Sequence, residues 1–112
     1  MSALVSADLE YGSGMRLTGG TTFPSLMAVG ATGDALDAYT IGRAAALEGR
    51  AAGIHVNFAP VADVNNNPAN PIINTRAFGE DPHAVGRLVT AFVRGLREHG
   101  MLSTLKHFPG HG

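Results

Sequence analysis

The stretch "DPHAVGRLVTAFVRGLREHGMLSTLKH", residues 81–107, contains the structural unit from which the fold can be deduced. Asp81 is a predicted N-cap, Pro82 suits the first helical turn and Gly100 ends the helix. The apolar residues of this helix recur on one face: Val85, Leu88, Val89, Phe92, Val93 and Leu96. The apolar run 101–105 then predicts a strand, so an amphipathic helix leads directly into a strand.

The same order of elements occurs earlier in the chain. The run "ALVSA", residues 3–7, predicts a first strand, and residues 54–59 predict a second strand that ends at Pro60. Between them, residues 34–52 predict a helix that follows a loop with a short helical turn after Pro24. Strands that alternate with amphipathic helices indicate parallel βαβ units. We therefore predict an α/β fold, a parallel βαβαβ segment with both long helices on one side of the sheet.

Two further expectations follow from the strand sequences. The first and third strands are apolar or small throughout, which is typical of strands buried on both faces. Polar residues follow each strand: Asp8 after the first, Asp63 and Arg76 in the loop after the second, and Lys106 and His107 after the third. Because the carboxyl ends of parallel strands meet at one edge, these side chains should converge on a shared site.

Composition excludes several classes of function. The chain has 112 residues, 45% of them hydrophobic and 15% charged, with a formal net charge of −1 and no cysteine. The charge gives no reason to expect a nucleic-acid partner, and thiolate metal sites and disulfides are impossible. No segment approaches the roughly 20 apolar residues of a membrane span. The first ten residues lack the features of a signal peptide, and the absence of cysteine does not choose between the cytoplasm and a periplasmic or secreted location, so the sequence leaves the compartment open.

Four motifs occur in order along the chain: "VSADLEYGSGMRL" at 5–17, "GIHVNFAPVADVNNNP" at 53–68, "NTRAFGEDP" at 74–82 and "KHFPGHG" at 106–112. Together they resemble the N-terminal catalytic domain of glycoside hydrolase family 3. The "KHFPGHG" ending is similar to the bacterial β-N-acetylhexosaminidase-like branch, whereas β-glucosidase members usually lack the Pro-Gly-His turn. The resemblance implies that residues 1–112 form the early βα units of a (β/α)₈ barrel.

The resemblance also implies roles for individual residues. Sugar-binding residues of the family match Asp8, Arg16, Arg76, Lys106 and His107. A carboxylate can accept two hydroxyl donors, and a guanidinium offers paired donors to hydroxyls or to an acetamido carbonyl. Lysine would donate to ring hydroxyls, and the histidine would do the same or orient the lysine. The family's nucleophile and acid/base, which its retaining mechanism requires, match no residue here and are expected downstream of Gly112.

Other polar residues have simpler interpretations. Glu10 lies two positions after Asp8 and cannot flank a glycosidic bond opposite it, so we interpret Glu10 as a structural carboxylate. His107 and His111 are four apart, but the Pro-Gly pair between them prevents a helix, so we expect no metal site and no cofactor. The three asparagines at 65–67 are expected to form turns, and Phe78 is expected to close a loop.

Alternatives remain open beside the glycosidase. The chain could be a non-catalytic carbohydrate-binding or scaffold remnant, or part of a β-glucosidase-type member of the same family. A flavodoxin-like module is disfavoured, because the Gly-rich "EYGSGMRL" does not lead directly into a helix. If the chain ends at Gly112, three strands leave open edges and an uncovered face, and we expect self-association. The exact sugar is left open.

Overall fold

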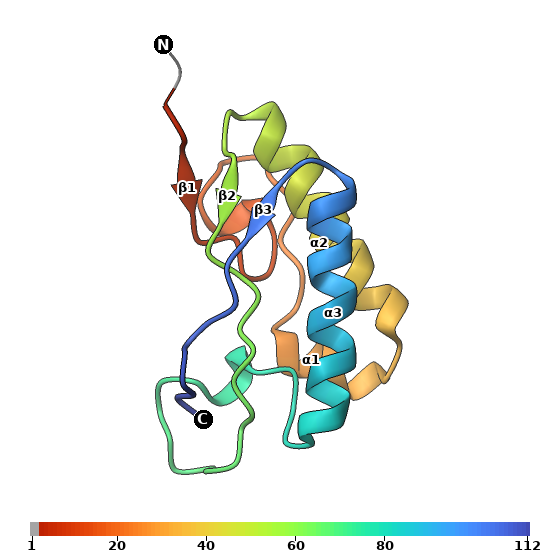
Figure 1. Cartoon of the computed structure of the whole chain (residues 1–112), viewed down its shortest axis with the longest axis vertical. Helices are drawn as coiled ribbons and strands as arrows, with labels where there is room; N and C mark the ends of the chain where they lie inside the picture. Colours follow the sequence, from red (N-terminus) through yellow and green to blue (C-terminus); the bar gives the residue numbers. More distant parts are fainter. Residues whose placement is uncertain (1–2) are drawn as a thin grey trace.

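Three short parallel strands form one sheet in the computed structural model, which describes residues 3–112 (Figure 1). The strands are β1 (Ser6–Ala7), β2 (Val56–Asn57) and β3 (Leu102–Ser103), in the order β1-β2-β3. Both neighbouring pairs are parallel, which confirms the predicted βαβαβ segment. The ladders are shorter than the predicted runs, although backbone hydrogen bonds continue past them, such as Thr104 N–H to the Ala59 carbonyl at 3.0 Å.

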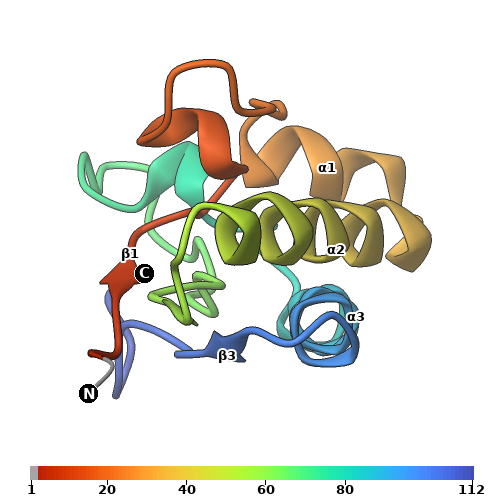
Figure 2. The same ribbon diagram turned by 90° about the horizontal axis from the view of Figure 1, so that it is seen from above.

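Two long helices cover one side of this sheet, as predicted (Figures 1 and 2). They are α2 (Ala35–Ala51) and α3 (Pro82–Glu98), and a shorter helix, α1 (Leu26–Thr32), precedes them. Asp34 and Asp81 cap the two long helices by accepting from the backbone N–H groups of Leu36 and His83. Short 3₁₀ turns occupy Ser13–Met15 and Asn74–Arg76. None of the helices within residues 3–112 is long and apolar enough to cross a membrane.

Helices α2 and α3 approach one another closely because glycines lie at their contact. A Cβ at Gly42 would overlap the carbonyl oxygen of Phe92, and a Cβ at Gly95 would overlap that of Tyr39. The Phe92 side chain is fully buried in the core beneath them. Phe78 is also buried and contacts Phe92 edge-to-face, with ring centroids 6.4 Å apart. Phe78, which was expected to close a loop, therefore also contributes its ring to the core.

The opposite side of the sheet is open within the described chain. The register places Ser6, Val56 and Leu102 side by side, and alternation puts Leu4 and Phe58 on the same face. Leu4 is 76% exposed and Leu102 is 61% exposed, so the expectation that β1 and β3 are buried on both faces is wrong. The physical reason is that both long helices lie on the other side (Figure 2). We call Leu4, Phe58 and Leu102 the open face.

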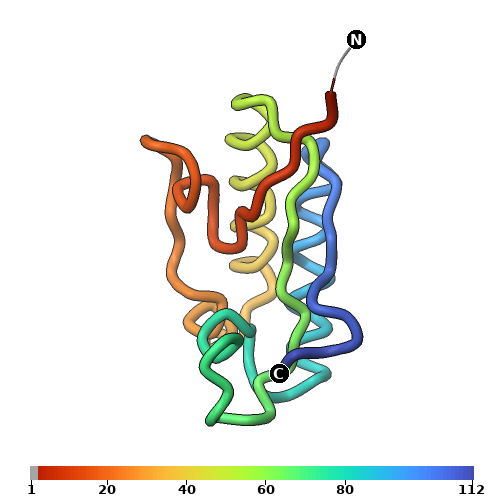
Figure 3. The backbone as a smooth tube through the Cα atoms, turned by 90° about the vertical axis from the view of Figure 1, so that its left-hand side faces the viewer, coloured from red at the N-terminus to blue at the C-terminus, as the bar shows by residue number. Residues whose placement is uncertain are grey.

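Beyond β2 and β3 the chain continues to pair, and this extension positions the polar residues. The Ala62 N–H donates to the Lys106 carbonyl at 2.7 Å, and the Lys106 N–H donates to the Pro60 carbonyl at 3.2 Å. The residues after Lys106 then lie against the loop that follows β2 (Figure 3). Within that loop, the Asn70 side chain donates to the His111 carbonyl. The C-terminal turn is thus held by the long polar loop.

Candidate functional site

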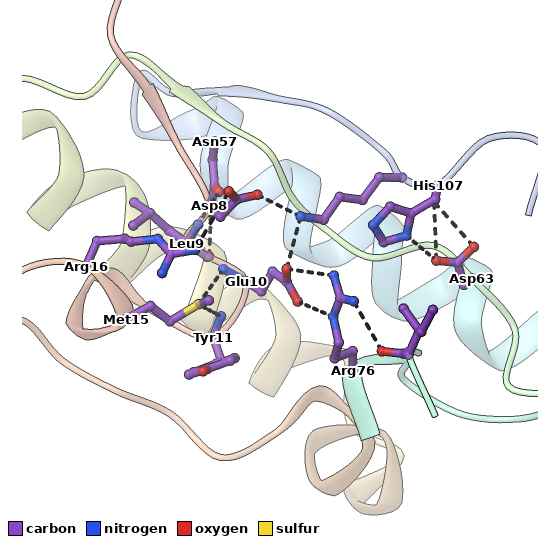
Figure 4. Close-up of polar contacts among 12 residues, drawn as sticks. Asp8, Leu9, Glu10, Tyr11, Met15, Arg16, Asn57, Asp63, Arg76 and His107 are labelled. Carbon is purple, nitrogen blue, oxygen red and sulfur yellow. Dashed lines mark hydrogen bonds and ion pairs between the residues drawn. The ribbon is translucent and has the colours of Figure 1, made fainter. Parts of the chain in front are cut away.

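Lys106 is the centre of a charged cluster at the carboxyl ends of the strands, whose members Asp8, Glu10, Arg16 and Arg76 are labelled in Figure 4. Its Nζ lies 2.9 Å from Asp8 Oδ1 and 3.0 Å from Glu10 Oε2. Asp8 and Glu10 follow β1, whereas Lys106 follows β3, so the contact spans the sheet. The predicted convergence of Asp8 with Lys106 is confirmed. We refer to Asp8, Glu10, Arg16, Arg76 and Lys106 as the strand-end network.

Glu10 joins Lys106 to Arg76 in this network. The Arg76 guanidinium donates from Nε to Glu10 Oε1 at 3.2 Å and from Nη2 to Oε2 at 3.1 Å. The Glu10 side chain is only 8% exposed, and burial opposes its charge, but hydrogen bonds from Arg76 and Lys106 outweigh burial and lower its pKa. The bond to Glu10 in turn raises the pKa of Arg76. Both groups are therefore charged, and Glu10 has the structural role expected for it.

Asp8 is the more accessible carboxylate of the network, with 40% of its side chain exposed. The hydrogen bond from Lys106 lowers the pKa of Asp8, which keeps the group ionised. Arg16 Nη2 lies 3.8 Å from Asp8 Oδ2, a looser ion pair at the solvent side. Asp8 is thus a partly exposed acceptor with cations on two sides.

A buried amide fixes the backbone between the two carboxylates. Asn57, in β2, has no exposed surface, and its Oδ1 accepts from the Leu9 N–H at 2.9 Å. Its Nδ2 donates to the Leu9 carbonyl at 3.1 Å. Because Leu9 separates Asp8 from Glu10, this pair of hydrogen bonds sets the direction of both carboxylates. An asparagine inside a short strand was the available signal for this role, and it was missed from the sequence.

The ring of His107 is directed to Asp63. It bonds to Asp63 (Figure 4), with Nδ1 2.6 Å from Oδ2. The Asp63 side chain is only 1% exposed. Burial opposes the charge of Asp63, but hydrogen bonds from the His107 ring and from the backbone N–H groups of His111 and His107 outweigh it and lower the pKa of Asp63. The alternative in which His107 orients Lys106 directly is not supported by this geometry.

The five predicted site residues therefore divide into two groups. Ion pairs join Arg16 and Lys106 to Asp8, and Glu10 links Arg76 to Lys106. His107 is instead bonded to Asp63. In the sequence, Asp63 is recognisable only as a polar residue after the second predicted strand. Its position beside His107 depends on the parallel bridge between Val61 and Lys106, which the sequence alone does not reveal.

Comparison with known proteins identifies the class to which this fold and site belong. The sequence model described as "Glycosyl hydrolase family 3 N terminal domain" matches residues 1–112. The chain therefore belongs to glycosyl hydrolase family 3, as the four motifs predicted. Its α/β segment corresponds to part of the family's (β/α)₈ barrel.

Individual relatives agree with this assignment. The chain is 48% identical over 96 residues to Beta-hexosaminidase A of Pseudoalteromonas piscicida, covering 82% of this chain and 16% of that protein. It is 40% identical over 110 residues to Beta-hexosaminidase LpqI of Mycobacterium tuberculosis, covering 96% of this chain and 28% of that protein. The structure of a family 3 β-N-acetylglucosaminidase from Paenibacillus superposes with a TM-score of 0.93 at 48% identity, over 100% of this chain and 22% of that one. The chain thus spans less than a third of the length of each.

Proposed function

We propose that this chain is the glycone-binding part of a retaining glycoside hydrolase that acts on β-N-acetylhexosaminides. The family membership and the relatives named as β-hexosaminidases support the substrate class. The observation that carries the proposal is the shared Lys106 Nζ, held 2.9 Å from Asp8 and 3.0 Å from Glu10 at the carboxyl ends of the strands. This edge is where (β/α)₈ enzymes bind their substrates.

The strand-end network offers acceptors and donors that match a sugar. Asp8 is ionised and partly exposed, so its oxygens can accept from adjacent hydroxyls while Lys106 and Arg16 balance its charge. Each of the three guanidinium nitrogens of Arg76 donates one hydrogen bond within the chain. Nε and Nη2 donate to Glu10, and Nη1 donates to the Ile72 carbonyl. A guanidinium has five N–H donors, so two remain for a hydroxyl or an acetamido carbonyl.

The network is suited to binding and not to bond cleavage. Retaining glycosidases need a nucleophile and an acid/base that flank the glycosidic bond about 5–5.5 Å apart. Asp8 and Glu10 come from one strand end, both contact the same ammonium group, and both have lowered pKa values, which disfavours a proton-donating role. The resemblance assigns the catalytic pair to later segments of the family's barrel. Our proposal therefore gives Asp8, Arg16, Arg76, Lys106 and His107 substrate-binding roles only.

Calorimetric titration of the 112-residue chain with N-acetylglucosamine and with glucose tests this proposal. We expect N-acetylglucosamine to bind more tightly, and Lys106→Met to weaken binding at least tenfold, since a charged hydrogen bond contributes about 1.5–3 kcal/mol. The matched control is Arg94→Met, because Arg94 on α3 pairs with Glu98 and lies over the Tyr39 ring, outside the strand-end network. Tighter binding of glucose would favour a β-glucoside substrate, and equal binding by the two variants would contradict the assigned site.

Turnover provides a second, independent test. The 112-residue chain is expected to release no chromophore from a chromogenic N-acetyl-β-glucosaminide, because none of its residues matches the catalytic pair. Turnover that is abolished by Asp8→Ala or His107→Ala would contradict the claim that these residues only bind the sugar.

A further inference from the structure

Asp63 is the buried carboxylate that the proposed function leaves without a role. It lies beneath the turn that follows Lys106 and accepts from three donors on that turn. The His111 N–H donates to Oδ1 at 2.7 Å, and the His107 N–H lies 3.3 and 3.2 Å from the two oxygens. The third donor is the His107 ring, whose Nδ1 lies 2.6 Å from Asp63 Oδ2.

This arrangement determines which ring nitrogen of His107 carries a proton. Asp63 is surrounded by backbone N–H donors, which stabilise the ionised carboxylate, and an ionised carboxylate has no proton to donate. The short contact to Nδ1 is therefore a hydrogen bond that His107 donates. In the neutral imidazole the other nitrogen, Nε2, is then an acceptor.

Further contacts restrict the orientation of the ring. The His111 ring packs edge-to-face against His107, with centroids 6.0 Å apart. The His107 side chain remains about one-third exposed, whereas Asp63 is almost completely buried. Asp63 thus contacts His107 from beneath, and part of the imidazole stays accessible to a ligand.

We propose that Asp63 is a positioning residue that holds His107 in the Nδ1–H tautomer, so that Nε2 accepts a hydrogen bond from a sugar hydroxyl. The inference rests on the proposed function, and it specifies the sense of a contact that the sequence left open. Lys106 donates and His107 accepts, so consecutive residues offer complementary groups to neighbouring hydroxyls. A hydroxyl can donate and accept, which lets one sugar satisfy both residues.

Two-bond ¹H–¹⁵N spectra of the histidine rings in the 112-residue chain test the tautomer directly, without any sugar. The His107 signals are assigned by their loss in His107→Gln. We expect the Nδ1–H form in the native chain and its loss in Asp63→Asn, because the asparagine Oδ1 can still accept the backbone bonds while its NH₂ group faces Nδ1. Asp34→Asn is the matched control, since Asp34 caps α2 far from His107 and asparagine caps equally well.

Sugar titration of the same proteins completes the test. Asp63→Asn should weaken N-acetylglucosamine binding about fivefold to tenfold, while Asp34→Asn should leave it unchanged. An Nε2–H form in the native chain would overturn the inference, and this result needs no variant that folds. An unchanged tautomer in folded Asp63→Asn would also overturn it, as would unchanged affinity in that variant. If the tautomer responds as expected but the native chain binds no sugar, the positioning role is supported and the proposed function fails.

Discussion

The helix-packed side of the sheet and the strand-end network are held together by different interactions. On the helix side, Gly42 and Gly95 allow α2 and α3 to approach, and Phe92 is buried among apolar atoms. At the strand ends, Lys106 and Arg76 neutralise carboxylates that are partly or largely removed from water. Apolar packing on the helix side therefore determines the fold, while the ion pairs of the strand-end network keep its charged groups oriented. Substitutions in the two regions should therefore affect different measurements.

The largest effect on stability is expected from the helix-packed side. Phe92→Ala should lower the free energy of unfolding by about 3–5 kcal/mol, because it leaves a cavity in the core between the long helices. Urea denaturation followed by circular dichroism measures this change. The matched control is Phe108→Ala, since Phe108 is almost fully exposed and its loss should change stability by less than about 0.5 kcal/mol. Equal effects of the two variants would contradict the assigned core.

A smaller loss is expected in the strand-end network, at Glu10. Glu10→Gln should destabilise the chain by about 2–3 kcal/mol, because Arg76 and Lys106 lose a largely buried counter-charge while Arg76 stays partly solvated. The same denaturation experiment measures it. Glu98→Gln removes a carboxylate from the exposed pair with Arg94 and should change stability by about 0.5 kcal/mol or less.

Acid should destabilise the folded chain through the buried carboxylates Glu10 and Asp63. The pKa values of Glu10 and Asp63 are lowered in the folded chain, so each contributes stability that is present above its ordinary pKa. That contribution is lost as the pH falls through the lowered pKa. We expect the urea midpoint to decrease below about pH 4, and Glu10→Gln to show a shallower decrease. A midpoint that rises on acidification would contradict this account.

Much of the fold could be predicted from the sequence because the signals are local. Caps at Asp34 and Asp81, and the apolar stripe on 82–98, identify the long helices, and strand–helix alternation gives the parallel order. The prediction of strands buried on both faces was wrong at Leu4 and Leu102, because composition does not say which segments cover a sheet.

The site was predicted less completely, for a different physical reason. Residues directly after strands were recognisable, and Asp8 and Lys106 do meet as expected. The contributions of Asn57 and Asp63 depend on which strands are neighbours and on their register, and their partners lie 48 and 44 residues away along the chain. Such long-range contacts leave little local pattern, so they were missed.

The smallest effect concerns the open face. The 112-residue chain in isolation is expected to self-associate, because Leu4, Phe58 and Leu102 form an apolar surface beside two strand edges. Leu102→Lys should shift the sedimentation velocity distribution toward the monomer. Leu36→Lys, at an exposed position on α2, is the matched control and should not shift it. A monomeric native chain with a cooperative melt would contradict this expectation.

The central claim is that the strand-end network binds a sugar, and an NMR titration with N-acetylglucosamine tests it most directly. Backbone amide shifts should change around Asp8, Lys106 and His107 and not along the α2–α3 contact. Asp8→Asn should weaken binding at least tenfold while leaving the urea midpoint nearly unchanged, because Asp8 is partly exposed. Shift changes confined to the helices, or an affinity that Asp8→Asn leaves unaltered, would contradict the account.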